Sequence, residues 1–122
     1  MGTCTAATRQ LLAVMAVVGL SLLSTPAQAS NSQWSKILRI AILNDDAAFV
    51  EVENTATQAA CGTASNGGRQ WTFLVNTSQG KAILNTLLTA HVMRVNVYIE
   101  GTGNCATGWS REDVLQAHIS AP

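Results

Sequence analysis

Two cysteines and the loop around the second are the residues of this chain best suited to chemistry. The stretch EGTGNCATGW, residues 100–109, combines three glycines with Cys105 and Trp109, and Cys61 lies in a similar stretch, ACGTASNGG. A cysteine in such surroundings can act as a nucleophile, a metal ligand or one half of a disulfide. Glycines in series can also form a phosphate-binding loop. The choice among these depends on the compartment in which the chain folds.

The N-terminal residues predict export. Arg9 precedes an apolar run, Leu11–Leu23, and a small-x-small site, Ala27–Ala29, follows it. These are the three regions of a secretory signal peptide. The run is shorter than the roughly 20 apolar residues that a membrane anchor needs. We therefore predict that residues 1–29 are a cleaved signal peptide and that residues 30–122 form a single domain. That domain is expected in the periplasm or outside the cell, with no membrane attachment after cleavage.

In an exported domain of this size, Cys61 and Cys105 predict a disulfide. Cys4 is lost with the signal peptide, so an even pair remains. A zinc site needs about four ligands, usually in closely spaced pairs, and a catalytic cysteine needs a reduced thiol beside a base. The chain offers only His91, His118 and scattered carboxylates for these roles. We therefore expect no metal and no cofactor.

The glycine-rich stretches do not fit a phosphate loop, which continues with Lys-Ser/Thr or with a helix. The residues after 100–109 have the pattern of a strand, so the glycines predict tight turns around the cysteines. The sequence contains no recognisable nucleophile–base set, and Asp45 and Asp46 are adjacent in a turn rather than spaced for acid–base catalysis. We predict that the protein is not an enzyme.

The charge balance argues against a nucleic acid as partner. The chain has seven Lys and Arg against seven Asp and Glu, and its formal net charge is +0. It contains no run of basic residues that would neutralise phosphates. The remaining partners are a glycan or another protein, and the domain is a candidate for self-association as a homo-oligomer.

Apolar periodicity predicts five strands and one helix. The strands are expected within residues 34–44, 47–54, 69–76, 94–100 and 113–120, with the helix within residues 80–92 after a cap at Thr77 or Ser78. The expected apolar strand faces are Leu38-Ile40-Ile42, Val50-Val52, Trp71-Phe73-Val75, Val95-Val97-Ile99 and Leu115-Ala117-Ile119. The second strand is expected to be half-exposed through its glutamates. The expected helical stripe is Ile83, Leu84, Leu87, Leu88 and His91.

The order of these elements is β-β-β-α-β-β, in a mainly β domain of the α+β class with one disulfide. An OB-type barrel, five-stranded and partly open, has this order, with the helix between the third and fourth strands. The alternative is an open α+β sheet covered by one helix.

At this level of detail the chain resembles a group of small exported bacterial proteins. The resemblance rests on CG before a strand that opens with Trp, on GKAILNTLLTA, on VNVYIEGTGNC, and on GW before EDVLQAHI. It covers residues 36–120. The order of elements in this group is similar to that of the B subunits of subtilase-cytotoxin-type toxins. The resemblance implies an OB fold, a pentameric ring and binding of sialylated glycans. The short hairpin ILNDDAAFVEV differs from the longer first loop of those subunits, and no sugar-contacting residue is carried over.

The residues expected to bind a ligand lie on and after the fourth strand. Tyr98 points outward there and Trp109 comes after the second cysteine; both offer an aromatic face with a polar edge. Glu100, Asn104 and Arg111 flank them and supply polar contacts. For Trp109 the other interpretation, which we expect, is a buried ring that covers the disulfide and plugs one end of the barrel.

The predicted function is therefore that of an exported, non-catalytic binding module, with a glycan as ligand and a toxin B-subunit-like ring as its assembly. The alternative is a structural or inhibitory envelope protein that acts by protein–protein contact.

Overall fold

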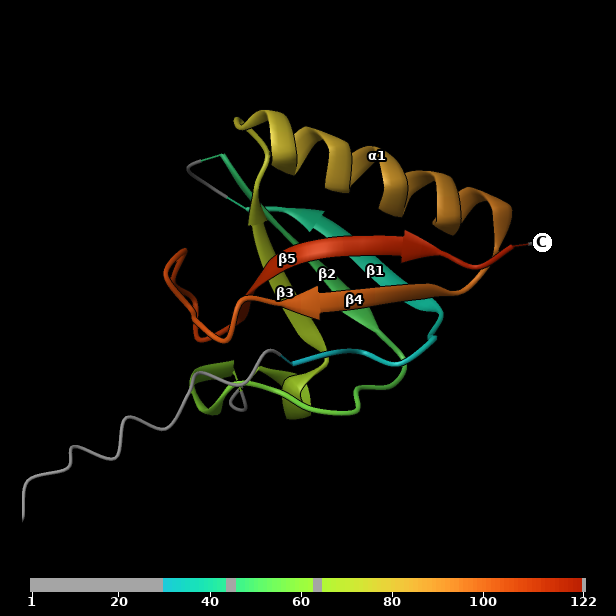
Figure 1. Ribbon diagram of the computed structural model, residues 1–122. Helices are drawn as coiled ribbons and strands as arrows, with labels where there is room; N and C mark the ends of the chain where they lie inside the picture. The colour runs from blue at the N-terminus through green and yellow to red at the C-terminus, as the bar shows by residue number, and fades with distance from the viewer. Residues whose placement is uncertain (1–29, 44–45, 63–64, 122) are drawn as a thin grey trace, which may run out of the picture.

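A computed structural model describes residues 30–43, 46–62 and 65–121 (Figure 1). The elements along the chain are β1 (Ile37–Ile42), β2 (Ala47–Val52), η1 (Ala60–Gly62), η2 (Asn66–Gly68), β3 (Gln70–Leu74), α1 (Ser78–Met93), β4 (Val97–Gly101) and β5 (Glu112–Ile119), where η denotes a short 3-10 helix. This confirms a mainly β domain of the α+β class. The predicted signal peptide, residues 1–29, lies outside the described residues.

The five strands form one mixed sheet in the order β1-β2-β3-β5-β4. The pairs β1–β2, β2–β3 and β4–β5 are antiparallel, whereas β3 and β5 run parallel over Trp71–Thr72 and Glu112–Asp113. The helix α1 connects β3 to β4 and lies across one face of the sheet, where it contacts β5, β1 and β3 (Figure 1). A helix on one face of a sheet buries the apolar sides of both elements.

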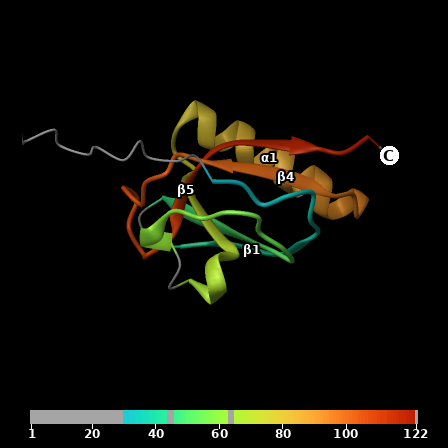
Figure 2. The ribbon, with the colours of Figure 1, turned by 60° about the horizontal axis from the view of Figure 1, so that its bottom comes forward.

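Residues 30–35, which precede β1, lie along the outer edge of β4. Isolated bridges pair Ser35 with Val97 and Asn31 with Glu100. Ser35 and Val97 exchange two backbone hydrogen bonds of 2.8 Å each. Figure 2 shows this cyan segment running beside β4. The sheet itself is not closed, but this segment carries the chain from the β4 edge to the start of β1.

The core lies between α1 and the sheet. Its fully buried side chains include Val50, Val52, Trp71, Leu87, Val97 and Ile99, each 0 % exposed. Complete burial of one such side chain contributes about 1.5–3 kcal/mol relative to its exposure. The expected apolar faces of the third and fourth strands are thereby confirmed.

The helix begins at the predicted cap, but only part of its predicted stripe is buried. The Thr77 hydroxyl accepts a hydrogen bond of 2.9 Å from the backbone N–H of Gly80. Gly80 packs so closely that a Cβ there would lie 1.5 Å from the Leu74 carbonyl oxygen. Gly80, Ile83, Leu87 and Ala90 form the buried side of the helix, and Leu84 also packs against the core, so Ile83, Leu84 and Leu87 lie as predicted. Leu88 and His91, which were predicted on the buried stripe, are exposed.

Two register shifts correct the predicted faces of the first and last strands. A shift between Ile37 and Arg39 places Ile37 in the core and leaves Leu38 50 % exposed. Ile42 lies on the same face as Ile40, but it is 62 % exposed at the end of the strand. A shift between Glu100 and Gly101 places Val114 in the core in place of Leu115. An extra residue in one strand reverses the side-chain alternation beyond it. Ile40, Ala117 and Ile119 pack against the core as predicted.

The second strand was expected to be half-exposed, and that prediction is wrong. Every residue of β2 is buried. Its inner face carries Val50 and Val52, and its outer face carries Phe49 and Glu51, which are 4 % and 8 % exposed. The guanidinium groups of Arg39 and Arg111 lie over the Phe49 ring, 4.9 and 4.6 Å from its centroid. Long side chains from β1 and from the residue before β5 therefore cover this face.

Candidate functional site

The predicted disulfide is present and joins η1 to the loop between β4 and β5. The Cα atoms of Cys61 and Cys105 are 6.1 Å apart. Gly103 and Gly108 in that loop have φ angles of 79° and 91°, a region that glycine enters without strain. The glycines around the second cysteine therefore make turns, as predicted, and the bridge holds two loops together.

A buried carboxylate lies between these two loops. Glu112, at the start of β5, is 0 % exposed. It accepts hydrogen bonds of 2.8 Å from the backbone N–H groups of Ala59 and Gly103. It also accepts a hydrogen bond from the Ser30 hydroxyl. One side chain thus fixes the first described residue, the segment before the first cysteine and the loop of the second.

The expectation that Trp109 plugs this end of the molecule is wrong. Its backbone lies beside the Cys61 loop, as expected, because the Ser65 hydroxyl donates to the carbonyl of Ser110. The Trp109 side chain is nevertheless 52 % exposed. Gly108, Trp109 and Ser110 all have positive φ angles. The turn is therefore formed by the backbone of these residues and not by packing of the Trp109 ring. Glu112 and its partners occupy the interior between the loops.

Arg111 and Asn104, two predicted ligand contacts, both form hydrogen bonds within the sheet or its loop. Besides covering Phe49, Arg111 donates from Nε to Oε1 of Gln70 at 2.8 Å. The backbone carbonyl of Asn104 accepts the N–H of Asp113 at 2.8 Å and so holds the β4–β5 loop, while Asn104 itself is exposed. Within the described part of the chain, no contact joins either residue to Tyr98. Arg111 and Asn104 therefore stabilise the sheet and its loop.

Tyr98 lies in a row of three rings on the outer face of the β4–β5 pair. Its ring centroid is 5.6 Å from that of Trp34 and 6.1 Å from that of His118, with tilted planes in both cases. Trp34 is 51 % exposed and His118 is also exposed. We call these three residues the aromatic row. Tilted contacts at such distances are favourable for aromatic pairs.

Glu100 extends this surface with a polar pair. In the β4–β5 ladder Tyr98 pairs with His118, and Glu100 pairs with Gln116. The side-chain amide of Gln116 donates a hydrogen bond to the Glu100 carboxylate. Because residues two apart in a strand share a face, the carboxylate and amide lie next to the aromatic row. The surface thus combines flat apolar faces with hydrogen-bonding groups.

Trp34 is the member of the aromatic row that local sequence patterns do not identify. It precedes β1, and its position is set by the paired hydrogen bonds between Ser35 and Val97. This pairing is not local, because β4 lies far along the chain. Its sequence environment, QWSK, does give one sign, since a large aromatic residue among polar neighbours is suited to an exposed binding surface.

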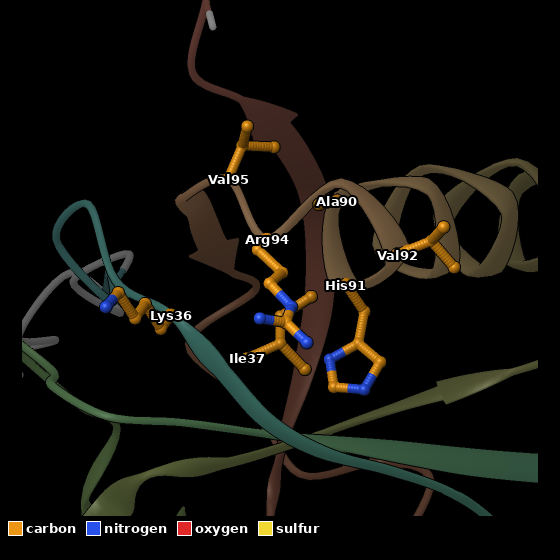
Figure 3. A pocket seen from close by; sticks show the side chains of 7 residues that line it. All are labelled: Lys36, Ile37, Ala90, His91, Val92, Arg94 and Val95. Carbon is orange, nitrogen blue, oxygen red and sulfur yellow. The ribbon is translucent and has the colours of Figure 1, made fainter.

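A cavity of about 480 Å³ lies at the C-terminal end of α1, close along the chain to the aromatic row (Figure 3). Three of its lining residues have basic side chains: Lys36, His91 and Arg94. The others are Ile37, Ala90, Val92 and Val95. In Figure 3 the His91 and Arg94 side chains extend from the end of the helix toward β1, while the Lys36 side chain points away from both of them. We call this cavity the basic pocket.

The outer face of β2 carries another buried carboxylate besides Glu112, that of Glu51. Burial raises the pKa of this carboxyl. Hydrogen bonds from Gln70 and Arg39, the charge of Arg39 and a hydrogen bond from Asn66 outweigh that effect, so the pKa lies below 4.5. The Arg39–Glu51 pair has an N–O distance of 2.8 Å. This cluster holds β1, β2 and η2 together, and both carboxylate oxygens of Glu51 accept hydrogen bonds.

In residues 30–43, 46–62 and 65–121, no group of three or more His, Cys, Asp or Glu is arranged to hold a metal ion. No helix in these ranges is long and apolar enough to span a bilayer. Comparisons with models of known protein families, with curated proteins and with solved structures give no significant match.

Proposed function

We propose that this protein is an exported, non-catalytic binding module and that a glycan binds on its aromatic row. The observation that carries the proposal is the line of Trp34, Tyr98 and His118, with ring centroids 5.6 and 6.1 Å apart. Half-exposed aromatic rings offer flat apolar faces that the C–H faces of a sugar ring can cover, and their polar edges take hydrogen bonds. Glu100 and Gln116 beside the row supply acceptors and donors for sugar hydroxyls.

The basic pocket adds a preference for a ligand that also carries negative charge. Trp34 and Lys36 come from one segment, and Arg94 and Tyr98 from another, so row and pocket lie along the same two stretches of chain. Lys36 and Arg94 are cationic at neutral pH. An acidic group on the glycan would therefore be attracted toward Lys36 and Arg94.

The fold proposed for this module is a partly open OB-type barrel. It is supported by the strand order β1-β2-β3-β5-β4, by the parallel β3–β5 contact, and by the bridges from residues 30–35 to β4. OB folds bind oligosaccharides among other ligands. The resemblance to B subunits of subtilase-cytotoxin-type toxins adds a ring of identical subunits to the proposal.

The experiment is a glycan array with the exported protein, and then calorimetric titration of the best ligand against two variants. Trp34→Ala and Trp109→Ala remove tryptophans of nearly equal exposure, 51 % and 52 %. We expect Trp34→Ala to weaken binding at least tenfold and Trp109→Ala to weaken it less, because the ring contacts of the aromatic row do not include Trp109. Absence of any bound glycan, or unchanged binding by Trp34→Ala, would contradict the proposal.

A second function, contact with a protein, is favoured by the apolar residues that α1 and β1 expose. Leu88 and Val92, which are one helical turn apart, are 44 % and 80 % exposed, and Leu38 and Ile42 on β1 are 50 % and 62 % exposed. Exposed apolar neighbours such as Leu88 and Val92 can mark an interaction site when they form part of a larger apolar patch. Native mass spectrometry separates a ring from a monomer, and Val92→Asp should dissociate an assembly that uses this helix face.

A further inference from the structure

Among the residues that the structure describes, the partners of the buried Glu112 carboxylate are all uncharged. It is 0 % exposed, and its hydrogen bonds come from two backbone N–H groups and one hydroxyl. In the described part of the chain the ion pair that forms is Arg39–Glu51, and no Lys, Arg or His reaches Glu112. Burial of a carboxylate without a counter-charge is costly. A cation from elsewhere would therefore stabilise this site strongly.

Ser30 is held directly against that carboxylate. It is 2 % exposed, its hydroxyl donates to Glu112, and its carbonyl accepts the N–H of Gly101 at 2.8 Å. Gly101 leaves no spare room, since a Cβ there would lie 2.0 Å from Oε1 of Glu112 and 2.7 Å from Oγ of Ser30. The backbone nitrogen and Oγ of a serine are attached to neighbouring carbons. The Ser30 nitrogen thus belongs to the residue that this carboxylate already holds through Oγ.

We propose that removal of the signal peptide after Ala29 creates the missing counter-charge, because the new α-ammonium group of Ser30 pairs with Glu112. A signal peptidase of the export machinery would hydrolyse the Ala29–Ser30 peptide bond with one water. The hydroxyl goes to the Ala29 carbonyl carbon and the hydrogen to the Ser30 nitrogen. A free α-amine, with an ordinary pKa of about 7.7–8.0, then takes up a further proton at neutral pH. Processing thus completes the packing of the two disulfide-linked loops.

This proposal rests on the predicted export and does not depend on a glycan ligand. In the uncleaved precursor the Ser30 nitrogen is an amide, which has no charge to offer. The precursor is therefore expected to be less stable than the processed domain. A chain that must stay unfolded during export would gain its full stability only after cleavage.

The first test compares four proteins exported with the same signal peptide: the wild type, an extra alanine inserted between Ala29 and Ser30, Glu112→Gln, and the combination. Intact mass establishes the first residue of each, and urea unfolding gives the equilibrium constants. The insertion moves the α-ammonium group from Ser30 to the extra alanine, one residue away from its proposed place beside Glu112. We expect it to raise the unfolding constant at least tenfold with Glu112 present and less than twofold with Glu112→Gln. Equal effects in both backgrounds, or an exported chain that does not begin at Ser30, would overturn the proposal.

The second test needs no variant and applies even where Glu112→Gln does not fold. The processed protein is treated with an amine-acetylating reagent at neutral pH, native and in urea, and labelling is read by peptide mass spectrometry. We expect the Ser30 amine to react at least tenfold more slowly in the native protein than in urea. The exposed amine of Lys81 should show little protection. A Ser30 amine that labels as freely as Lys81 would overturn the proposal and leave glycan binding unaffected.

Discussion

At the scale of single residues, Trp71 and Trp109 show how surroundings decide what a large ring contributes. Trp71 is 0 % exposed in the core and Trp109 is 52 % exposed on a turn. We predict that Trp109→Ala changes the free energy of unfolding by no more than about 0.5 kcal/mol, as surface substitutions usually do. Trp71→Ala, the matched control, should cost about 3–5 kcal/mol. Thermal melts of both variants would test this; a large loss of stability in Trp109→Ala would restore the buried-plug interpretation.

The Glu51 carboxylate is expected to make the stability of the folded protein depend on pH in the acid range. Because its pKa is lowered in the folded protein, the stabilisation is fully present above the ordinary value of 4.5 and is lost as pH falls through the lower folded value. We predict that Glu51→Gln is less stable at pH 7 by about 1–3 kcal/mol, because the donors around it lose a charged acceptor. Between about pH 5 and 2 this variant should lose less stability than the wild type.

The control for this prediction is Glu53→Gln, which removes the same charge from an exposed position. Urea unfolding at a series of pH values measures both variants. If Glu53→Gln and Glu51→Gln gave the same pH profile, overall charge rather than the Glu51 cluster would account for acid sensitivity.

At the scale of elements, the start of α1 depends on one side chain. Thr77 accepts the N–H of Gly80 at 2.9 Å and donates to the Leu74 carbonyl at 3.2 Å, so it joins the end of β3 to the first helical turn. We predict that Thr77→Ala lowers the free energy of unfolding by about 1 kcal/mol, within the 0.5–2 kcal/mol range of N-caps. Ser78→Ala, one residue later and exposed, should change it by less than about 0.5 kcal/mol. Equal losses would mean that the cap does not carry the effect.

The strands show which part of the fold the sequence could predict. Trp71, Phe73, Val97 and Ile99 alternate regularly, and their buried faces can be read from the pattern. The register shifts in β1 and β5 depend on the partner strand, which local alternation does not contain. The faces of those two strands were therefore predicted partly wrong. The burial of Glu51 has the same origin, since its covering groups come from other elements.

In the candidate site too, local sequence patterns predicted some residues and missed those that depend on long-range pairing. Tyr98 and Glu100 were assigned to the outer face from the alternation of their own strand, and they lie there. The cysteine pair was predicted from parity and the expected compartment. Trp34 belongs to the aromatic row only through a long-range pairing with β4, so no local pattern could place it.

At the scale of the whole molecule, residues 30–35 connect the β4 edge of the sheet to the start of β1. The backbone N–H groups of Ser32, Ser35 and Val97 donate across the gap to Ile99, Val97 and Ser35, at 2.9, 2.8 and 2.8 Å. If these hydrogen bonds break only when the whole domain unfolds, their amide hydrogens exchange with solvent as slowly as those in the central strand pairs.

We therefore predict that the amides of Ser35 and Val97 exchange within about tenfold of amides in the β2–β3 ladder, while Gly67, exposed in its turn, exchanges far faster. Native-state hydrogen exchange monitored by NMR measures each amide separately. Protection at Ser35 means that the segment that positions Trp34 is part of the cooperative fold, and that the aromatic row is fixed before a ligand arrives. Exchange at Ser35 as fast as at Gly67 would mean that the segment detaches on its own. Trp34 would then reach the other two rings only part of the time, and ligand affinity would fall by that fraction.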